Sequence, residues 1–187
     1  MEKSIIDLIA ALTNIDKTYI TIIGLNQRSK EYQQSAEAAF TAELYHQWKN
    51  IIRNDSTDYY DDLQIHYDLT KERFGGKRPD LVLHKGPNSR SIQKLYVEIK
   101  TSLATTNYDS DFEKLILAVS TDNNNNQLGY EKAVFLSNSA SYSSVCDSIK
   151  NFINQKNLSK EQNLEKILSI HLNSDFTVTI KPFSELI

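Results

Sequence analysis

The chain has 187 residues, which we expect to form a single domain (residues 1–187), and its 40% hydrophobic and 24% charged residues are typical of a globular protein. Its one cysteine, Cys146, excludes an internal disulfide framework and a zinc site built from cysteines. The net charge of −3 argues against strong nucleic-acid binding through overall basic charge. No apolar run reaches the roughly 20 residues of a membrane span, and the first residues lack the features of a secretory signal. We therefore expect a cytoplasmic protein that does not contact a membrane.

Two helices are predicted in the first third of the chain. Apolar residues recur at spacings of three and four over 3–13 and again over 29–53. The polar run Asn54-Asp55-Ser56 ends the second of these helices. Between them, the β-branched and aromatic stretch 18–25 predicts a strand or an extended connector.

Three strands are predicted next. Residues 63–69 alternate apolar and polar side chains, as in a half-buried strand. Two apolar segments, 80–85 and 95–100, predict two further strands, and Gly86-Pro87-Asn88-Ser89 predicts a tight turn between them. Because this connection is too short for a helical crossover, we expect an antiparallel meander.

The remaining elements alternate helices and strands before a final hairpin that turns at Asn173-Ser174. They are a helix over 109–120, a buried strand over 132–138, a helix over 142–155 and hairpin strands over 167–172 and 176–181. This order predicts an α/β fold in which helices flank a mixed central sheet.

Charged residues interrupt two of the predicted strands. Asp80 opens the strand 80–85, while Glu98 and Lys100 lie two residues apart near the end of the strand 95–100, so their side chains leave the same face. In an antiparallel pair the start of one strand meets the end of its partner. We therefore expect Asp80 beside Glu98 and Lys100, with the backbone carbonyl of Ile99 as a further oxygen.

This arrangement predicts a divalent-metal site. Mg²⁺ prefers oxygen ligands and retains several waters, so Asp80, Glu98 and the carbonyl of Ile99 suffice as protein ligands. Such a metal polarises a phosphoryl oxygen and lowers the pKa of a bound water. Lys100 would orient that water and offset the charge that develops in the transition state. An acid-x-Lys element alone is not specific, so the prediction depends on the strand and turn context around it.

Pro79-Asp80, followed by Glu98-Ile99-Lys100, resembles the signature of the PD-(D/E)XK superfamily, the restriction-endonuclease-like nucleases. The segment 37–48 is similar to their first core helix, and the resemblance spans about residues 35–138, an α-β-β-β-α-β core. It implies a restriction-endonuclease-like fold and Mg²⁺-dependent hydrolysis of phosphodiester bonds, with Mn²⁺ as a substitute metal. Asp80 and Glu98 would bind the metal, and Lys100 would lie at the attacking water.

The resemblance also implies a nucleic acid as the partner, and we expect DNA. It leaves open whether the chain is an endonuclease or an exonuclease, and whether it acts as a homodimer or with a partner protein. The short motifs of this superfamily diverge widely, so the resemblance indicates the fold better than the substrate.

One further acidic residue is expected from the helix 29–53. Glu43 lies between Phe40 and Leu44 on the apolar side, where a surface acid would be costly. We therefore prefer Glu43 as the residue that completes the metal shell or orients the water. Glu37, three residues before Phe40, remains the alternative.

Basic residues surround the predicted site and could bind phosphate despite the acidic overall charge. Six of them fall within 20 residues: Lys71, Arg73, Lys77, Arg78, Lys85 and Arg90. Lys77 and Arg78 are candidate substrate contacts. His84, which shares a strand face with Asp80, and Lys114, which could reach a phosphate, are two more.

Two other interpretations remain. Asp80 could be a turn residue after Pro79, with Glu98 and Lys100 forming a surface ion pair on an edge strand, worth about 0–1 kcal/mol. Alternatively, the chain retains the nuclease fold without turnover and acts as a nucleic-acid-binding or protein-binding module.

Overall fold

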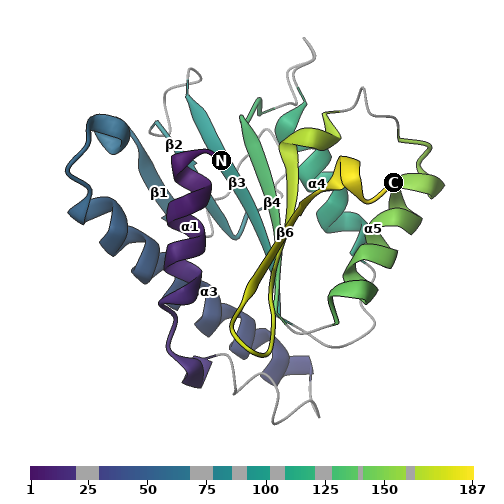
Figure 1. The fold of residues 1–187 in the computed structure, drawn as a ribbon, viewed down its shortest axis with the longest axis horizontal. Helices are drawn as coiled ribbons and strands as arrows, with labels where there is room; N and C mark the ends of the chain where they lie inside the picture. The colour runs from purple at the N-terminus through teal and green to yellow at the C-terminus, as the bar shows by residue number, and fades with distance from the viewer. Residues whose placement is uncertain are drawn as a thin grey trace.

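The computed structural model describes residues 1–19, 30–67, 78–85, 92–101, 108–120, 128–138, 141–158 and 163–187, with the side chains of helix α3 from Glu37 onward. The described strands form one six-stranded mixed sheet in the order β1-β2-β3-β4-β5-β6, and helices lie on both of its faces (Figure 1). The predicted α/β class with a mixed, helix-flanked sheet is therefore confirmed in this general form.

The first half of the chain forms one edge of the sheet. Its elements are α1 (Lys3–Thr13), α3 (Lys30–Asn54), the 3₁₀ helix η1 (Asp58–Tyr60), β1 (Gln64–Tyr67), β2 (Leu81–His84) and β3 (Gln93–Lys100). β1 pairs antiparallel with β2, and β2 pairs antiparallel with β3, so the predicted meander is confirmed. Lys85 N–H donates to the carbonyl of Ile92 (2.9 Å), which closes the β2–β3 connection; the predicted turn 86–89 itself lies outside the described residues.

The second half extends the sheet with strands parallel to β3. Its elements are α4 (Asp109–Val119), β4 (Lys132–Ser137), α5 (Tyr142–Gln155), the 3₁₀ helix η4 (Leu164–Lys166), β5 (Ile167–Leu172), β6 (Val178–Pro182) and the 3₁₀ helix η5 (Phe183–Glu185). β4 is parallel to β3 and β5 is parallel to β4, and α4 and α5 provide the crossovers that parallel neighbours require. β6 returns antiparallel to β5, which confirms the predicted hairpin.

Local signals explain how several helices begin. Ser141 Oγ accepts a hydrogen bond from Ser144 N–H (3.3 Å) and caps α5. Asp109 and Asp111 lie in the first turn of α4, where acids favour the positive end of the helix dipole. The 25-residue α3 carries many polar side chains, and across the described ranges no helix combines the length and apolarity needed to traverse a lipid bilayer.

The prediction of a strand or extended connector over 18–25 is wrong for the two residues of this stretch that the structure describes. Thr18 and Tyr19 are helical, whereas residues 20–25 lie outside the described part of the chain. Asp16 Oδ1 accepts hydrogen bonds from both Thr18 N–H (2.8 Å) and Thr18 Oγ1 (2.6 Å). This side-chain cap outweighs the preference of β-branched residues for extended backbone.

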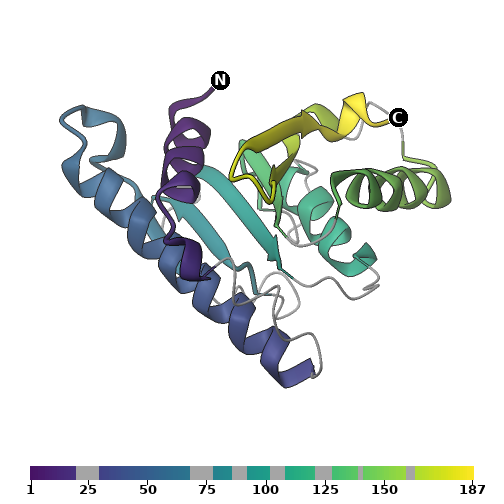
Figure 2. The same cartoon turned by 60° about the horizontal axis from the view of Figure 1, so that its bottom comes forward.

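Side chains alternate along the central strands and divide the core between the two faces of the sheet. Leu95, Val97 and Ile99 of β3 pack with α1 and α3, whereas Tyr96 packs with α4 and α5. Figure 2 shows α1 and α3 on one side of the sheet and α4 and α5 on the other. The even-numbered residues of β3 are therefore turned toward α4.

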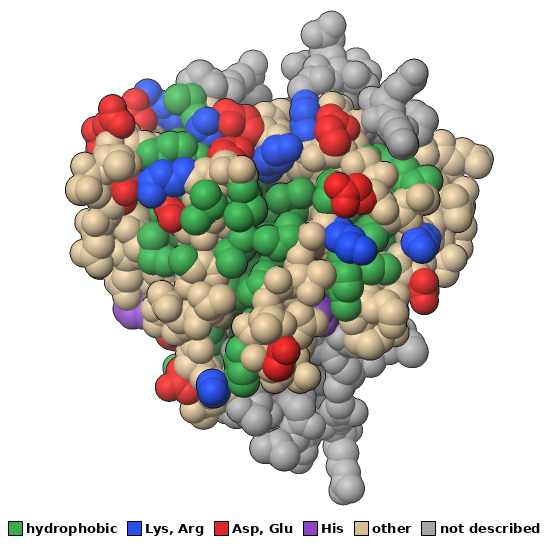
Figure 3. Space-filling view, viewed as in Figure 1, with side chains coloured by type: hydrophobic (Ala, Val, Ile, Leu, Met, Phe, Trp, Pro, Cys, Tyr) green, Lys and Arg blue, Asp and Glu red, His purple; other side chains and the backbone are tan. Residues whose placement is uncertain are grey.

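The α1–α3 face is less completely covered at β5 and β6. Leu168, Val178 and Ile180 are only partly buried there. Figure 3 shows hydrophobic side chains gathering between α1 and β6 on this side of the molecule. The opposite face, against α4 and α5, carries a group of aromatic rings centred on Phe112.

Phe112 on α4 tests that aromatic packing. Its fully buried ring lies edge-on to Phe135, Phe152 and Phe183, with centroids 5.0, 5.3 and 5.7 Å away. We expect Phe112→Ala to lower the free energy of unfolding by about 3–5 kcal/mol, because it removes these contacts and leaves a cavity. Urea unfolding can be followed by the fluorescence of the single, fully buried tryptophan, Trp48. Phe112→Leu should cost less, and a loss under about 1 kcal/mol for Phe112→Ala would contradict this packing.

Candidate active site

Asp80 immediately precedes β2, and its carboxylate reaches the neighbouring strand. The first paired residues of β2 and β3 are Leu81 and Val97, so Ile99 lies beyond the end of β2. Asp80 Oδ2 accepts a hydrogen bond from Ile99 N–H (2.6 Å). The side-chain oxygen thus replaces the backbone carbonyl that a longer β2 would have offered to Ile99. The structure therefore brings Asp80 beside the segment Glu98–Lys100, as the antiparallel register predicts.

Glu98 lies on an interior strand and is 1% exposed. Its two oxygens accept different hydrogen bonds, Oε1 from Tyr96 Oη (2.6 Å) and Oε2 from Lys114 Nζ (2.7 Å). The alternative in which Glu98 belongs to a surface ion pair on an edge strand is therefore wrong. Burial of a carboxyl group at this position needs these two donors, because an unpaired buried charge is strongly disfavoured.

Lys100, at the end of β3, lies between two acids from different helices. Its Nζ is 3.5 Å from Glu37 Oε1 on α3 and 3.5 Å from Asp111 Oδ2 on α4. The other oxygen of Glu37 accepts a hydrogen bond from Thr101 N–H (3.3 Å). Glu37 thereby holds both the lysine and the backbone that leaves the sheet.

Lys114 joins the acids of β3 and α4. Its Nζ is 2.7 Å from Glu98 Oε2 and 3.0 Å from Asp111 Oδ1, one turn earlier on the same helix. We call six residues the acid–lysine cluster. Five of them are joined by the contacts above, namely Glu37, Glu98, Lys100, Asp111 and Lys114. The sixth, Asp80, adjoins them through its hydrogen bond from Ile99 N–H, between Glu98 and Lys100. The cluster contains four carboxyl and two ammonium groups, so negative charge is in excess when all of them are ionised.

The two acids of the strands have raised pKa values. Burial raises the pKa of Asp80 to about 6, although the Ile99 N–H and the charge of Lys100 act in the opposite direction. Burial raises the pKa of Glu98 to about 8, and the neighbouring charge of Asp80 adds to this rise, while Lys114 and Tyr96 oppose it. Strongly raised pKa values of this kind concentrate at functional sites.

The two lysines keep their charge in spite of burial. Burial lowers the pKa of Lys114, but its ion pair and hydrogen bond with Glu98, reinforced by Asp111, raise that pKa above its ordinary value overall. Burial likewise lowers the pKa of Lys100, whereas Glu37 and Asp111 together produce a net increase. Both ammonium groups are therefore available as fixed positive charges.

The donor set of the cluster fits Mg²⁺ in kind. Within the described ranges, no group of three or more His, Cys, Asp or Glu side chains is arranged to hold a metal ion. Mg²⁺, however, is commonly bound by one or two carboxylates, with waters and substrate phosphates supplying the other ligands. Asp80 and Glu98 provide that number. The N–H of Ile99 points to Asp80, and the carbonyl of a strand residue points to the same side as its N–H, so the Ile99 oxygen is directed there too.

The predicted helical acid requires a correction. Glu43 Oε1 accepts a hydrogen bond from Gln47 Nε2 (2.7 Å), one turn further along α3, whereas Glu37 contacts Lys100. The two acids are six positions apart, which corresponds to about 9 Å along the helix axis and about 240° around it. The preference for Glu43 over Glu37 as the acid beside Lys100 is therefore wrong.

His84 also requires a correction. It is fully buried at the far end of β2, about 13 Å along the strand from Asp80, and its ring packs 4.9 Å from that of His66. It shares a strand face with Asp80, as predicted, but its side chain is inaccessible to a substrate.

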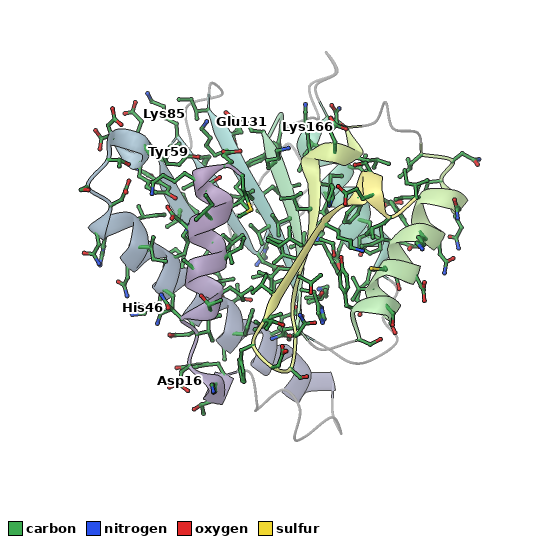
Figure 4. The ribbon with its side chains drawn as sticks, in the orientation of Figure 1. Asp16, His46, Tyr59, Lys85, Glu131 and Lys166 are labelled. Atoms are coloured by element: carbon green, nitrogen blue, oxygen red, sulfur yellow. The ribbon has the colours of Figure 1, made fainter. Side chains whose placement is uncertain are left out.

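The predicted basic surface is only partly visible. Arg78 is exposed next to Pro79, whereas Lys77 lies outside the described residues, as do Lys71, Arg73 and Arg90. Lys85 pairs with Asp62 (2.7 Å) and lies with Glu131 near the upper end of the molecule in Figure 4, at the opposite end of β2 from Asp80. Among the described candidate substrate contacts, Lys114 reaches the cluster, through Glu98 and Asp111.

Sequence reasoning missed Asp111 and assigned no site role to Tyr96. The helix dipole alone explains an acid at position 111, in the first turn of α4. The contacts of Asp111 with Lys100 and Lys114 were therefore not expected. A usable signal was present, because Asp111 lies four residues before Leu115 and therefore on the buried face of that helix. For Tyr96 the signal was its position two residues before Glu98 on the same strand face.

Comparisons with known proteins give no relative: no family model, curated protein or solved structure matches this chain. The acid–lysine cluster and the sequence motifs that form it are therefore the features of this chain that bear on its function.

Glu98→Gln tests the state of the buried carboxyl group. The pKa of Glu98 is about 8 in the folded protein, against an ordinary value of 4.5, so between these values the folded state holds a proton that the unfolded state has released. This contribution to the free energy of unfolding falls as the pH rises through that interval. Glutamine cannot ionise, so we expect Glu98→Gln to gain stability relative to the wild type between about pH 5 and pH 8 in urea unfolding experiments.

The control for this experiment is Glu43→Gln, which makes the same chemical change outside the cluster. Its stability difference from the wild type gives the effect of the Glu-to-Gln change itself, and the gain expected for Glu98→Gln is judged against it. A pH-independent difference for Glu98→Gln, or a trend in the opposite direction, would contradict the raised pKa.

Proposed function

We propose that this chain is a metal-dependent nuclease that hydrolyses phosphodiester bonds, with DNA as the expected substrate. The observation that carries the proposal is the convergence of the buried Glu98 carboxyl group of β3 and the half-buried Asp80 carboxyl group just before β2, with the ammonium group of Lys100 in the same cluster. Carboxylate pairs of this kind bind divalent cations at phosphoryl-transfer sites.

Two further observations support membership of the PD-(D/E)XK superfamily. The element order α3-β1-β2-β3-α4-β4 is the α-β-β-β-α-β order that the resemblance implies. The motif residues lie together: Asp80 immediately precedes β2, and Glu98 and Lys100 lie at the end of the neighbouring strand β3. The superfamily assignment remains part of our proposal.

In this proposal Asp80, Glu98 and the carbonyl of Ile99 hold Mg²⁺, or Mn²⁺ as its substitute. Bound there, the cation polarises a phosphoryl oxygen and lowers the pKa of a water molecule. Lys100 positions the attacking water and offsets the negative charge that develops on the phosphate. Glu37 orients Lys100 through the contact at 3.5 Å and takes the place that we had expected for Glu43.

Cleavage assays test these roles. We expect Asp80→Asn, Glu98→Gln and Lys100→Met each to lower the rate of Mg²⁺-dependent cleavage of plasmid or single-stranded DNA by at least about 100-fold. Glu37→Gln should cost about 10–100-fold, because it acts through Lys100. Thermal unfolding of each variant shows whether it is folded.

The matched control is Glu43→Gln, which makes the same substitution as Glu37→Gln on the same helix and should retain the wild-type rate. Unchanged cleavage in Asp80→Asn and Lys100→Met would reject the assignment of these residues. Equal losses in Glu37→Gln and Glu43→Gln would reject the role of Glu37.

One observation favours a second candidate, a binding module without turnover. Each carboxyl group of the cluster already has a donor or an ammonium group from the protein itself. A nuclease-fold protein that only binds nucleic acid or a protein would need no further cation. Binding of DNA in the absence of divalent metal, without any cleavage when the metal is added, would select this candidate.

A further inference from the structure

The ion pair between Lys114 and Glu98 is the shortest ammonium–carboxylate contact in the acid–lysine cluster. Lys114 Nζ is 2.7 Å from Glu98 Oε2, whereas Lys100 Nζ is 3.5 Å from each of its acidic partners. The pair is also the most enclosed one, with side-chain exposures of 18% for Lys114 and 1% for Glu98. The two residues come from different elements, α4 and β3.

This ion pair occupies the oxygen of Glu98 that a metal would need. Oε1 already accepts the hydroxyl proton of Tyr96, which leaves Oε2 as the oxygen directed at a cationic partner. Mg²⁺ binds carboxylate oxygens at about 2.0–2.1 Å. A metal on Oε2 would therefore lie within about 5 Å of an ammonium group held 2.7 Å from the same atom, and two such charges in a buried site repel each other strongly.

We propose that Lys114 is a built-in counterion of Glu98, which a divalent cation must displace in order to bind. This inference rests on the proposed metal-dependent function and adds a residue that tunes the metal affinity of the site. It assigns Lys114 to the acid of β3 rather than to substrate phosphate in the metal-free protein.

Asp111 gives the displaced ammonium group a place to remain. It contacts Lys114 at 3.0 Å through Oδ1 and is itself 5% exposed, so the lysine can leave Glu98 without entering a region that lacks a counter-charge. The exchange therefore replaces one cation at Glu98 by another and keeps Lys114 within the cluster. The cost is one broken ion pair, which weakens metal binding in the wild type.

Mn²⁺ titration tests the displacement without reference to cleavage. The unbound Mn²⁺ is measured by its paramagnetic resonance signal for the wild type and for Lys114→Gln, which removes the charge but can still donate a hydrogen bond to Glu98. Affinities are compared at the high-pH plateau of a pH series, where Glu98 is ionised in both proteins, because loss of Lys114 also favours the protonated form of Glu98. At that plateau we expect Lys114→Gln to bind Mn²⁺ at least about 10-fold more tightly than the wild type, since a nearby unit charge shifts such equilibria by one to three decades.

Two control variants separate charge from other effects. Lys114→Arg retains the charge and should stay within about 3-fold of the wild-type affinity. Lys156→Gln removes an ammonium group that pairs with Glu113 on the exposed side of α4 and should leave the affinity unchanged. An affinity for Lys114→Gln that equals or falls below that of the wild type would overturn the inference.

A second measurement uses the wild type alone and is independent of whether the variants fold. The rate of reductive methylation of Lys114, followed by mass spectrometry, should rise when Mn²⁺ is added, whereas that of Lys156 should not change. If the wild type binds Mn²⁺ with no effect on Lys114 labelling, this inference falls while the nuclease proposal stands. If neither the wild type nor any Lys114 variant binds Mn²⁺, both fall.

Discussion

A carboxyl group buried in the middle of a sheet is the constraint around which this molecule is organised. Glu98 is 1% exposed on an interior strand, and its burial requires a hydroxyl donor from Tyr96 and an ammonium group from Lys114 of α4. Buried ion pairs contribute little net stability, because desolvation cancels much of the attraction. Folding stability alone therefore does not account for a cluster of four acids and two lysines at the end of β3, and the function that we propose gives these charges a role.

Most of the fold follows from hydrophobic periodicity. The helices α1 and α5 begin and end where the spacing of apolar residues predicts, and the short connection between β2 and β3 correctly predicts an antiparallel pair. The exception at Thr18 and Tyr19 has a local cause, since a single capping side chain, Asp16, overrides the strand preference. Periodicity describes which face a residue occupies, and capping decides where the backbone changes direction.

The candidate site could be predicted only as far as strand geometry reaches. Alternation and register predict that Asp80 lies beside Glu98 and Lys100. They give the face of the sheet on which a side chain lies but not how deeply it is buried, so the full burial of His84 was not foreseen. Which of Glu37 and Glu43 contacts Lys100 depends on where α3 crosses the end of the sheet. The local sequence pattern of the helix does not determine that crossing point. The role of Asp111 in the cluster was missed because an acid in the first turn of α4 is already explained by the helix dipole.

A crystal structure of the wild-type protein grown with Mn²⁺ and measured at the manganese absorption edge tests the central claim most directly. Our account predicts an anomalous peak within bonding distance, about 2.0–2.3 Å, of carboxylate oxygens from both Asp80 and Glu98. An empty site at saturating Mn²⁺, with the carboxylates of Asp80 and Glu98 unchanged, would contradict it. So would a peak that only one of these two residues touches.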